Sequence, residues 1–208
     1  LPSTEIIGIP DDDDDDDDVE VVKDDGEPDF VYWPVCNEWQ KIKCQHLGLD
    51  YVKGNHSHIS EPQNFSRLHN PQARGRIVGD GNCFFRALAV LITGSQEDHV
   101  ELRALITTYL SHNADQFSSY LKEHESIIQY LKISKMDTLT VWATEIEIFA
   151  AAQMLQTSIY VYAISGGKYT WLEHAPIENV NCSISQHFQE AIYLTNISNH
   201  YETVKSME

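Results

Sequence analysis

The sequence lacks the features that would predict disulfide bonds, a signal peptide or a transmembrane segment. Its 208 residues include four cysteines, at positions 36, 44, 83 and 182, and no two of them form a CxxC pair. A disulfide framework is therefore not expected, and a chain of this length can bury a core without one. Residues 1–10 have neither a basic start nor a long apolar stretch, so no signal peptide or transmembrane segment is visible.

Positive charge is also scarce. The chain has 14 basic and 32 acidic residues, for a net charge of −18. Residues 1–29 carry 14 of the acidic residues and one lysine, so the remainder is only mildly acidic. Nucleic-acid binding needs a basic stripe, and none is present. We therefore expect no nucleic-acid partner.

The acidic excess gathers in one run, Asp11 to Asp18, which has eight consecutive carboxylates. These charges repel one another and have nothing apolar to bury, so residues 1–29 are predicted to be a disordered acidic tail. The simplest interpretation is a solvated tail. The alternatives are that the tail attracts a basic partner or that it binds Ca²⁺ weakly.

Residues 30–75 are predicted to form an aromatic extension and a linker. Tyr32, Trp33 and Trp39 supply apolar surface, and a short helix is expected around residues 38–42. The stretch 54–75, rich in Asn, His, Ser, Pro and Gly, is typical of a linker. This region also contains side chains that could bind zinc: Cys36, Cys44, His46, His56 and His58. No two of them have the short spacing of a zinc-finger ligand pair, so a zinc site is disfavoured.

The most informative stretch surrounds Cys83. Asp80, Gly81 and Asn82 favour a tight turn, and an apolar run with helical spacing follows the cysteine. Cys83 is thus expected at a helix N-terminus, where the macrodipole and free N–H groups stabilise a thiolate and can bind an oxyanion. The alternative is a small buried residue that happens to begin a helix.

A nucleophilic thiol needs a base, and the segment 198–204 offers one. It places His200 in a turn before a short alternating run. An early Cys on a helix and a late His on a strand follow the chain order of papain-like sites.

Between these two segments, helical and strand patterns alternate. Helices are predicted over residues 95–110 and 114–132 and after a capping box formed by Thr144 and Glu147. Trp142 is expected to be a packing anchor. Strands are expected over 158–164 and 169–172, joined by a Gly-Gly turn, and over 191–195 and 201–204. The result is a mixed α/β or α+β domain over residues 76–208, whose sheet carries the histidine toward the cysteine.

The motif Asp80-Gly81-Asn82-Cys83-Phe84-Phe85-Arg86-Ala87 resembles the nucleophile motif of the ovarian-tumour (OTU) family of cysteine deubiquitinases. The blocks at 142–150 and 159–162 are similar to the family's Trp-Gly and Glu-Leu-x-Ala helix and its core strand. Residues 199–202 are similar to its terminal His-Tyr block. The sequence departs from the family pattern at Ala143, where Gly is usual, and at Glu202, where Asp or Asn is usual.

The resemblance implies a papain-like α+β fold, with a small sheet packed between helices, and a thiol-dependent ubiquitinyl hydrolase. Cys83 would be the nucleophile and His200 the general base, and backbone N–H groups of Asp80, Gly81, Asn82 and Cys83 would bind the oxyanion. The implied partner is ubiquitin or polyubiquitin conjugates, with no cofactor, no metal and no membrane. The implied location is inside the cell, in cytoplasm or nucleus.

The residue that orients His200 is open at this point. Glu202 lies two positions further along an extended strand, so its side chain faces the same way as that of His200. Asn199 and Asp80 are the alternatives. Two rival functions also remain: a catalytically inactive module that binds ubiquitin, and a general papain-like peptidase that cleaves unfolded peptides.

Overall fold

The computed structural model describes residues 30–52, 61–65, 69–121, 124–177 and 190–208. The acidic tail and Cys182 lie outside the described residues. The helices are α1 (Asn37–Leu47), α2 (Cys83–Ile92), α3 (His99–His112), α4 (Ala114–Phe117), α5 (Ile127–Ser134) and α6 (Glu145–Leu155). The strands are β1 (Phe30–Tyr32), β2 (Gln63–Phe65), β3 (Pro71–Gly75), β4 (Ile159–Ser165), β5 (Lys168–His174), β6 (Ile192–Ile197) and β7 (His200–Met207).

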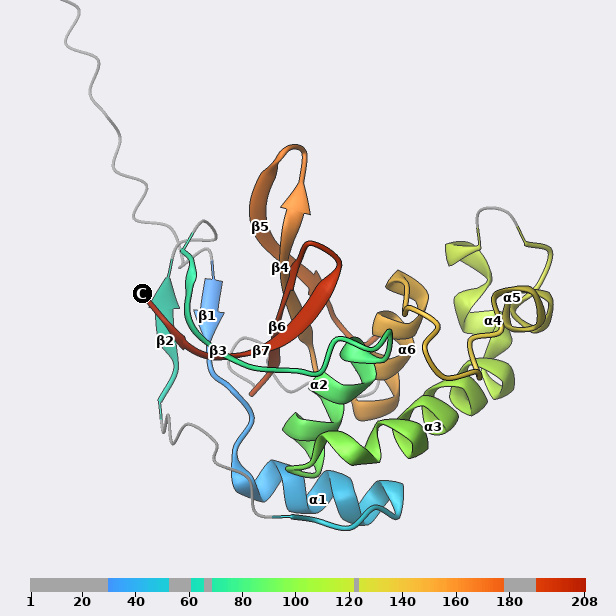
Figure 1. Ribbon diagram of the computed structural model, residues 1–208, viewed down its shortest axis with the longest axis horizontal. Helices are drawn as coiled ribbons and strands as arrows, with labels where there is room; N and C mark the ends of the chain where they lie inside the picture. Colours follow the sequence, from blue (N-terminus) through green and yellow to red (C-terminus); the bar gives the residue numbers. More distant parts are fainter. Residues whose placement is uncertain (1–29, 53–60, 66–68, 122–123, 178–189) are drawn as a thin grey trace, which may run out of the picture.

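Five of these strands form one sheet in the order β3-β7-β6-β4-β5. Neighbours are antiparallel except β4 and β6, which run parallel and are joined through the segment that follows β5. Helices α2, α3 and α6 gather on one side of this sheet, as Figure 1 shows. The predicted α+β class is confirmed.

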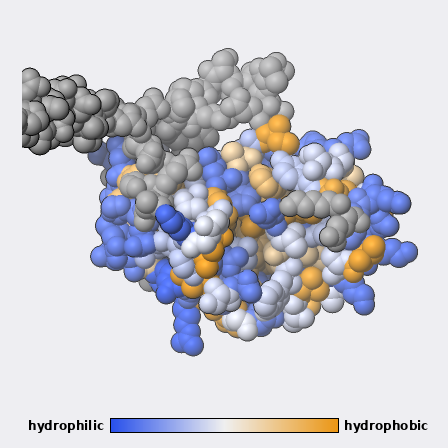
Figure 2. Space-filling model, turned by 90° about the horizontal axis from the view of Figure 1, so that it is seen from above, coloured by the Kyte–Doolittle hydropathy of each residue, from blue (hydrophilic) through white to orange (hydrophobic). Residues whose placement is uncertain are grey.

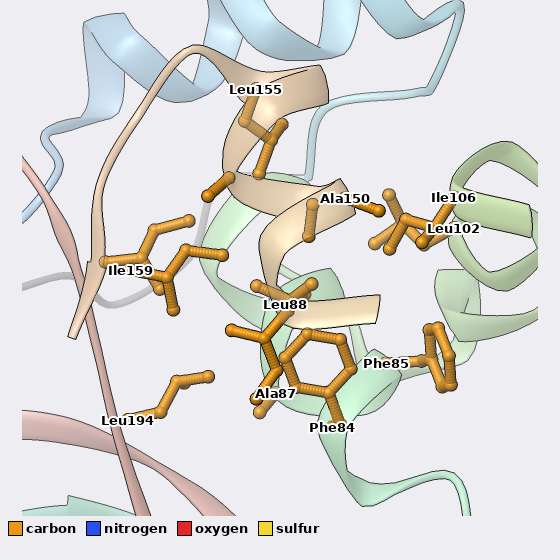
Figure 3. Close-up of a cluster of buried hydrophobic side chains, with 14 of the residues drawn as sticks. Phe84, Phe85, Ala87, Leu88, Leu102, Ile106, Ala150, Leu155, Ile159 and Leu194 are labelled. Atoms are coloured by element: carbon orange, nitrogen blue, oxygen red, sulfur yellow. The ribbon is translucent and has the colours of Figure 1, made fainter. Parts of the chain in front are cut away.

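The main core lies between the helices and one face of the sheet. Side chains alternate along the strands, so Ile159 and Val161 of β4 point into this core whereas Tyr160 and Tyr162 belong to the opposite face. Figure 3 shows side chains from α2, α3 and α6 meeting those of β4 and β6 in one cluster. The core therefore fixes α2, and with it Cys83, relative to the sheet.

The second face of the sheet is covered by aromatic side chains rather than by helices. Phe30 stacks on Trp171, with ring centroids 4.8 Å apart and planes 14° apart. Tyr32 is fully buried against Tyr193, at a centroid distance of 4.6 Å. The aromatic extension thus packs on the domain, and Figure 1 places β1 and β2 beside the C-terminal end of β7.

Helix α1 secures the C-terminal end of α2. The buried Gln40 side chain donates to the Leu91 carbonyl oxygen at 2.7 Å, and the Cys44 thiol donates to the Ile92 carbonyl oxygen at 3.2 Å. The last carbonyl groups of a helix have no partners within the helix, so these bonds satisfy buried acceptors. Cys44 therefore has a structural role.

The structure differs from the predictions made for two stretches, 54–75 and 114–132. The stretch 54–75, expected to be a linker, contains β2 and β3, and β3 pairs with β7 along the edge of the sheet. The boundary predicted at residue 76 falls directly after β3. The helix expected over 114–132 is instead α4 and α5, because Leu121 is extended and the Ser126 side chain caps a new helix at Gln129 N–H.

At residue 95 the helix does not begin as an α-helix. The Ser95 side chain caps a 3-10 turn over Gln96–Asp98, and α3 follows. The capping box of Thr144 and Glu147 is confirmed, with both reciprocal bonds present. In the described part of the chain, no helix has the length and apolarity needed to cross a bilayer. The face shown in Figure 2 is mainly hydrophilic, with scattered hydrophobic patches.

Stacking on Trp171 predicts the effect of removing the Phe30 ring. Phe30 is 3% exposed, so Phe30→Ala should lower the free energy of unfolding by about 3–5 kcal/mol. Urea denaturation followed by tryptophan fluorescence measures this. The control is Ile164→Ala, since Ile164 is 61% exposed and should change stability by no more than about 0.5 kcal/mol. Equal effects of the two substitutions would contradict the role given to β1.

Candidate active site

Cys83 is the first residue of α2, as predicted. Nine of the ten residues of this helix are buried, so packing leaves the helix a single orientation. Because Cys83 begins the helix, its backbone N–H has no acceptor within the helix and is available to a ligand. Cys83 is 7% exposed and lines a small pocket of about 60 Å³. The other residues that line the pocket are Gly81, Phe84, Trp142, Ala143, Asn196, Asn199 and Tyr201.

The loop before Cys83 is pressed against a second segment. Gly81 has φ +82°, a conformation that costs residues with a Cβ about 1–2 kcal/mol. A Cβ at this position would also collide with the Thr140 carbonyl oxygen. Thr140 itself has φ 70°, which is unusual for a β-branched residue. Only glycine therefore fits at position 81.

Asp80 shapes this loop from its solvent side. Its carboxylate accepts from Arg86 Nε at 3.0 Å and Nη2 at 2.7 Å, and from the Asn82 backbone N–H at 3.0 Å. The hydrogen bonds from Arg86 hold the pKa of Asp80 well below its usual range. The Asn82 N–H is thus occupied, so it is the least suited of the four predicted N–H groups to bind an oxyanion.

His200 reaches the site from a hairpin turn. Ser198 and Asn199 have φ 54° and 61°, the conformation of a tight turn between β6 and β7. His200 is the first residue of β7 and pairs with Ile197. Its ring lies against the start of the Cys83 loop, since a Cβ at Gly79 would be 3.6 Å from His200 Cε1.

Tyr201 anchors the same turn to α2. Its ring packs edge-on against Phe84, at a centroid distance of 5.4 Å, and it lines the pocket beside Cys83. Burial raises the pKa of Tyr201 to about 12, so the phenol stays neutral. The neighbours of His200 and Cys83 in the chain are therefore in direct contact across β7 and α2.

Glu202, Asp80 and Asn199 are the predicted candidates for orienting His200. The Glu202 carboxylate bonds to Arg74 Nη1 at 2.6 Å, and Asp80 is committed to Arg86. Asn199 lines the pocket. Among the hydrogen bonds of the described residues, none joins these side chains to the imidazole of His200. The assignment of Glu202 stays a prediction.

Sequence reasoning missed some residues at this site. Trp142, expected to be a packing anchor, is 60% exposed and lines the pocket. Its position directly before Ala143, in one of the blocks that resemble the family, was the available signal. Arg103 and Thr140 reach the Cys83 loop from distant segments, and only the charge of Arg103 within an apolar helical face could have drawn attention to it.

With this geometry in place, comparison with known proteins identifies the family. A family profile described as OTU-like cysteine protease matches residues 78–201, which include Cys83 and His200. The chain belongs to the OTU family. The predicted resemblance is confirmed, and the matched span covers more than half of the chain.

Individual relatives are distant. OVARIAN TUMOR DOMAIN-containing deubiquitinating enzyme 7 of Arabidopsis thaliana is 30% identical over 87 residues, which cover 42% of this chain and 23% of that protein. OTU domain-containing protein 1 of Mus musculus is 28% identical over 139 residues, which cover 63% of this chain and 28% of that protein. The chain thus matches about a quarter of the length of these curated relatives.

Solved structures agree with the OTU assignment. The OTU domain of OTUD1 superposes with a TM-score of 0.51 and 27% identity, over 64% of this chain and 85% of that domain. The viral OTU domain protease from Dera Ghazi Khan virus superposes with a TM-score of 0.52 at 17% identity, over 65% of this chain and 81% of that one. At that identity, the viral structure supports the fold alone.

Because Gly81 lies against Thr140, a methyl group at position 81 is expected to distort the Cys83 loop. Gly81→Ala should slow alkylation of Cys83 by iodoacetamide and lower the melting temperature. The matched control is Gly167→Ala, because Gly167 has φ +81° but open space around a Cβ. That variant should lose only about 1–2 kcal/mol of stability and keep the parental alkylation rate. Peptide mapping by mass spectrometry follows Cys83 separately from the other thiols.

Proposed function

We propose that this chain is an active cysteine isopeptidase that removes ubiquitin or a ubiquitin-like modifier from conjugates. The observation that carries the proposal is the junction of α2 and β7, where the thiol of Cys83 lines a pocket beside the turn that holds His200. The family assignment supports the same chemistry, since OTU proteins are described as cysteine proteases.

The reaction would proceed through a thioester. The Cys83 thiolate attacks the carbonyl carbon of the scissile bond, after His200 has accepted the thiol proton. The N–H groups of Cys83 and Gly81 stabilise the oxyanion. His200 then gives its proton to the departing lysine amine, and the C–N bond breaks. A water molecule activated by His200 hydrolyses the thioester and releases the free thiol.

The size of the pocket favours a slender substrate. A volume of about 60 Å³ suits small residues, such as the Gly-Gly tail of ubiquitin, better than bulky side chains. The Arabidopsis relative is named as a deubiquitinating enzyme, which supports this substrate class. Such conjugates occur in the cytoplasm and nucleus, where we place the activity. We also propose that the acidic tail of residues 1–29 binds a basic partner.

A ubiquitin probe with a C-terminal electrophile tests the function directly. Labelling of Cys83 supports the proposal. Binding without labelling would indicate an inactive ubiquitin-binding module, and cleavage of unfolded peptides without probe reactivity would indicate a general peptidase. Either of these results would overturn the proposed activity.

Loss of the thiol should abolish turnover and spare binding. Cys83→Ala should lower hydrolysis of ubiquitin conjugates by roughly a thousandfold or more, since the thiol supplies the chemistry. Its dissociation constant for ubiquitin should stay near that of the parent, as measured by calorimetry. Cys36→Ala is the control, because Cys36 is a free thiol distant in sequence from the site. Retained turnover in Cys83→Ala would show that another residue is the nucleophile.

Glu202 is proposed to orient His200. If it does, Glu202→Gln should lower kcat by roughly tenfold or more with little change in KM, and Glu202→Asp should be milder. The control is Glu173→Gln, because Glu173 is a strand residue whose carboxylate bonds to Tyr160 at 2.8 Å. Should Glu202→Ala run at the parental rate while Asn199→Ala or Asp80→Ala loses activity, the role belongs to one of those residues.

A further inference from the structure

Arg103 is a buried cation on the apolar face of α3. Its side chain is 1% exposed, and its guanidinium lies over the Phe85 ring, 3.9 Å from the centroid. Burying a charge is costly unless it is compensated by hydrogen bonds or ion pairs. No carboxylate among the described residues forms a direct ion pair with Arg103, although the charges of Glu147, Asp80 and Asp137 favour its charged form. Direct contacts to the guanidinium therefore come from its hydrogen bonds.

Those hydrogen bonds join three segments of the chain. Arg103 Nη1 donates to the Met136 carbonyl oxygen at 2.9 Å. Nη2 donates to the Val141 carbonyl oxygen at 2.8 Å and to Asn82 Oδ1 at 2.9 Å. The planar guanidinium can reach these acceptors at once, which the single ammonium of a lysine cannot do. One side chain thus ties the segment Met136–Val141 to the residue that precedes Cys83.

Asn82 is the point where these contacts converge. Its Oδ1 also accepts from the Thr140 backbone N–H, at 2.8 Å, and its own N–H donates to Asp80 Oδ1 at 3.0 Å. Asn82 is 3% exposed. Thr140 holds its left-handed conformation against Gly81, a strain that persists only where surrounding contacts enforce it. Arg103 and Asn82 supply those contacts.

The orientation of Asn82 matters because it belongs to the peptide unit that carries the Cys83 N–H. That N–H is an oxyanion donor in the proposed mechanism. With Asn82 Oδ1 held by Arg103 and Thr140, and the Asn82 N–H held by Asp80, both sides of the residue are fixed. The peptide between Asn82 and Cys83 is therefore kept from turning its N–H away from the pocket.

We propose that Arg103 is a positioning residue, which acts through the Asn82 side chain to hold the Cys83 loop against the segment Met136–Val141 in the form required for turnover. This inference rests on the proposed function. It assigns a role to a residue outside the blocks that resemble the family motifs. At 1% exposure, Arg103 is too deeply buried to touch a substrate.

Two variants test the inference, each with its own purpose. Asn82→Ala removes the shared acceptor and leaves Arg103 bonded to Met136 and Val141. Arg103→Lys keeps the charge and loses the simultaneous bonds. The control is Thr107→Val, because Thr107 lies one turn further along α3 and is buried, and its hydroxyl donates to the backbone carbonyl oxygens of Arg103 and Ala104. Any general loosening of α3 should appear in all three proteins.

Three measurements are needed: kcat and KM with ubiquitin carrying a fluorogenic C-terminal amide, the pH profile of Cys83 alkylation by iodoacetamide, and amide hydrogen exchange. Alkylation needs the thiolate but no oxyanion donor. For Asn82→Ala we expect kcat to fall by ten- to a hundredfold, with KM and the alkylation profile within twofold of the parent. Exchange should accelerate in residues 79–83 and 136–141. Arg103→Lys should show the same pattern, and Thr107→Val should show none of it.

Other results have distinct meanings. An unchanged kcat in Asn82→Ala would overturn the inference, as would a parallel fall in alkylation, which would indicate a damaged thiolate site. A parent protein that does not hydrolyse ubiquitin substrates would overturn the proposed function and the catalytic role given to the contact between Arg103 and Asn82. In that case hydrogen exchange still tests whether the contact holds the loop. Unchanged exchange in both variants would show that Arg103 and Asn82 do not hold residues 79–83 against residues 136–141.

Discussion

The burial of α2 is the constraint on which the rest of the structure depends. Its residues face the sheet on one side and α3 and α6 on the other, while α1 satisfies the carbonyl groups at its C-terminal end. A helix enclosed in this way cannot rotate or slide without opening cavities in a closely packed core. Its first residue, Cys83, is consequently fixed in position by hydrophobic packing rather than by polar contacts of its own.

The polar contacts of the site involve the loop that precedes Cys83 rather than Cys83 itself. Asp80 and Arg86 hold the Cys83 loop from the solvent side, and Arg103 holds it from the core through Asn82. Both arginines bind residues that precede the cysteine, Arg86 through Asp80 and Arg103 through Asn82. The loop is thus held from two sides, which in the proposed mechanism would keep its backbone N–H groups aimed at the oxyanion with little reorganisation.

The extension before the matched OTU region also serves the site. β3 pairs with β7, the strand that begins at His200, and Arg74 of β3 binds Glu202 of β7. The aromatic residues of β1 cover the outer face of the same sheet. Residues upstream of the family match therefore support the strand that carries the proposed base, which gives the aromatic extension a structural purpose.

The sequence by itself determined the features that depend on neighbouring residues: the helix that begins at Cys83, the capping box of Thr144 and Glu147, the two hairpins and the family. Turn chemistry, capping and periodicity act over a few positions and can be read directly. Only the tertiary structure decided that Arg103 meets Asn82, that Trp142 is exposed at the pocket, that β3 joins the sheet and that Glu202 bonds to Arg74. Each of these depends on residues brought together from distant segments, and their burial and hydrogen bonding are set by three-dimensional packing that local patterns do not encode.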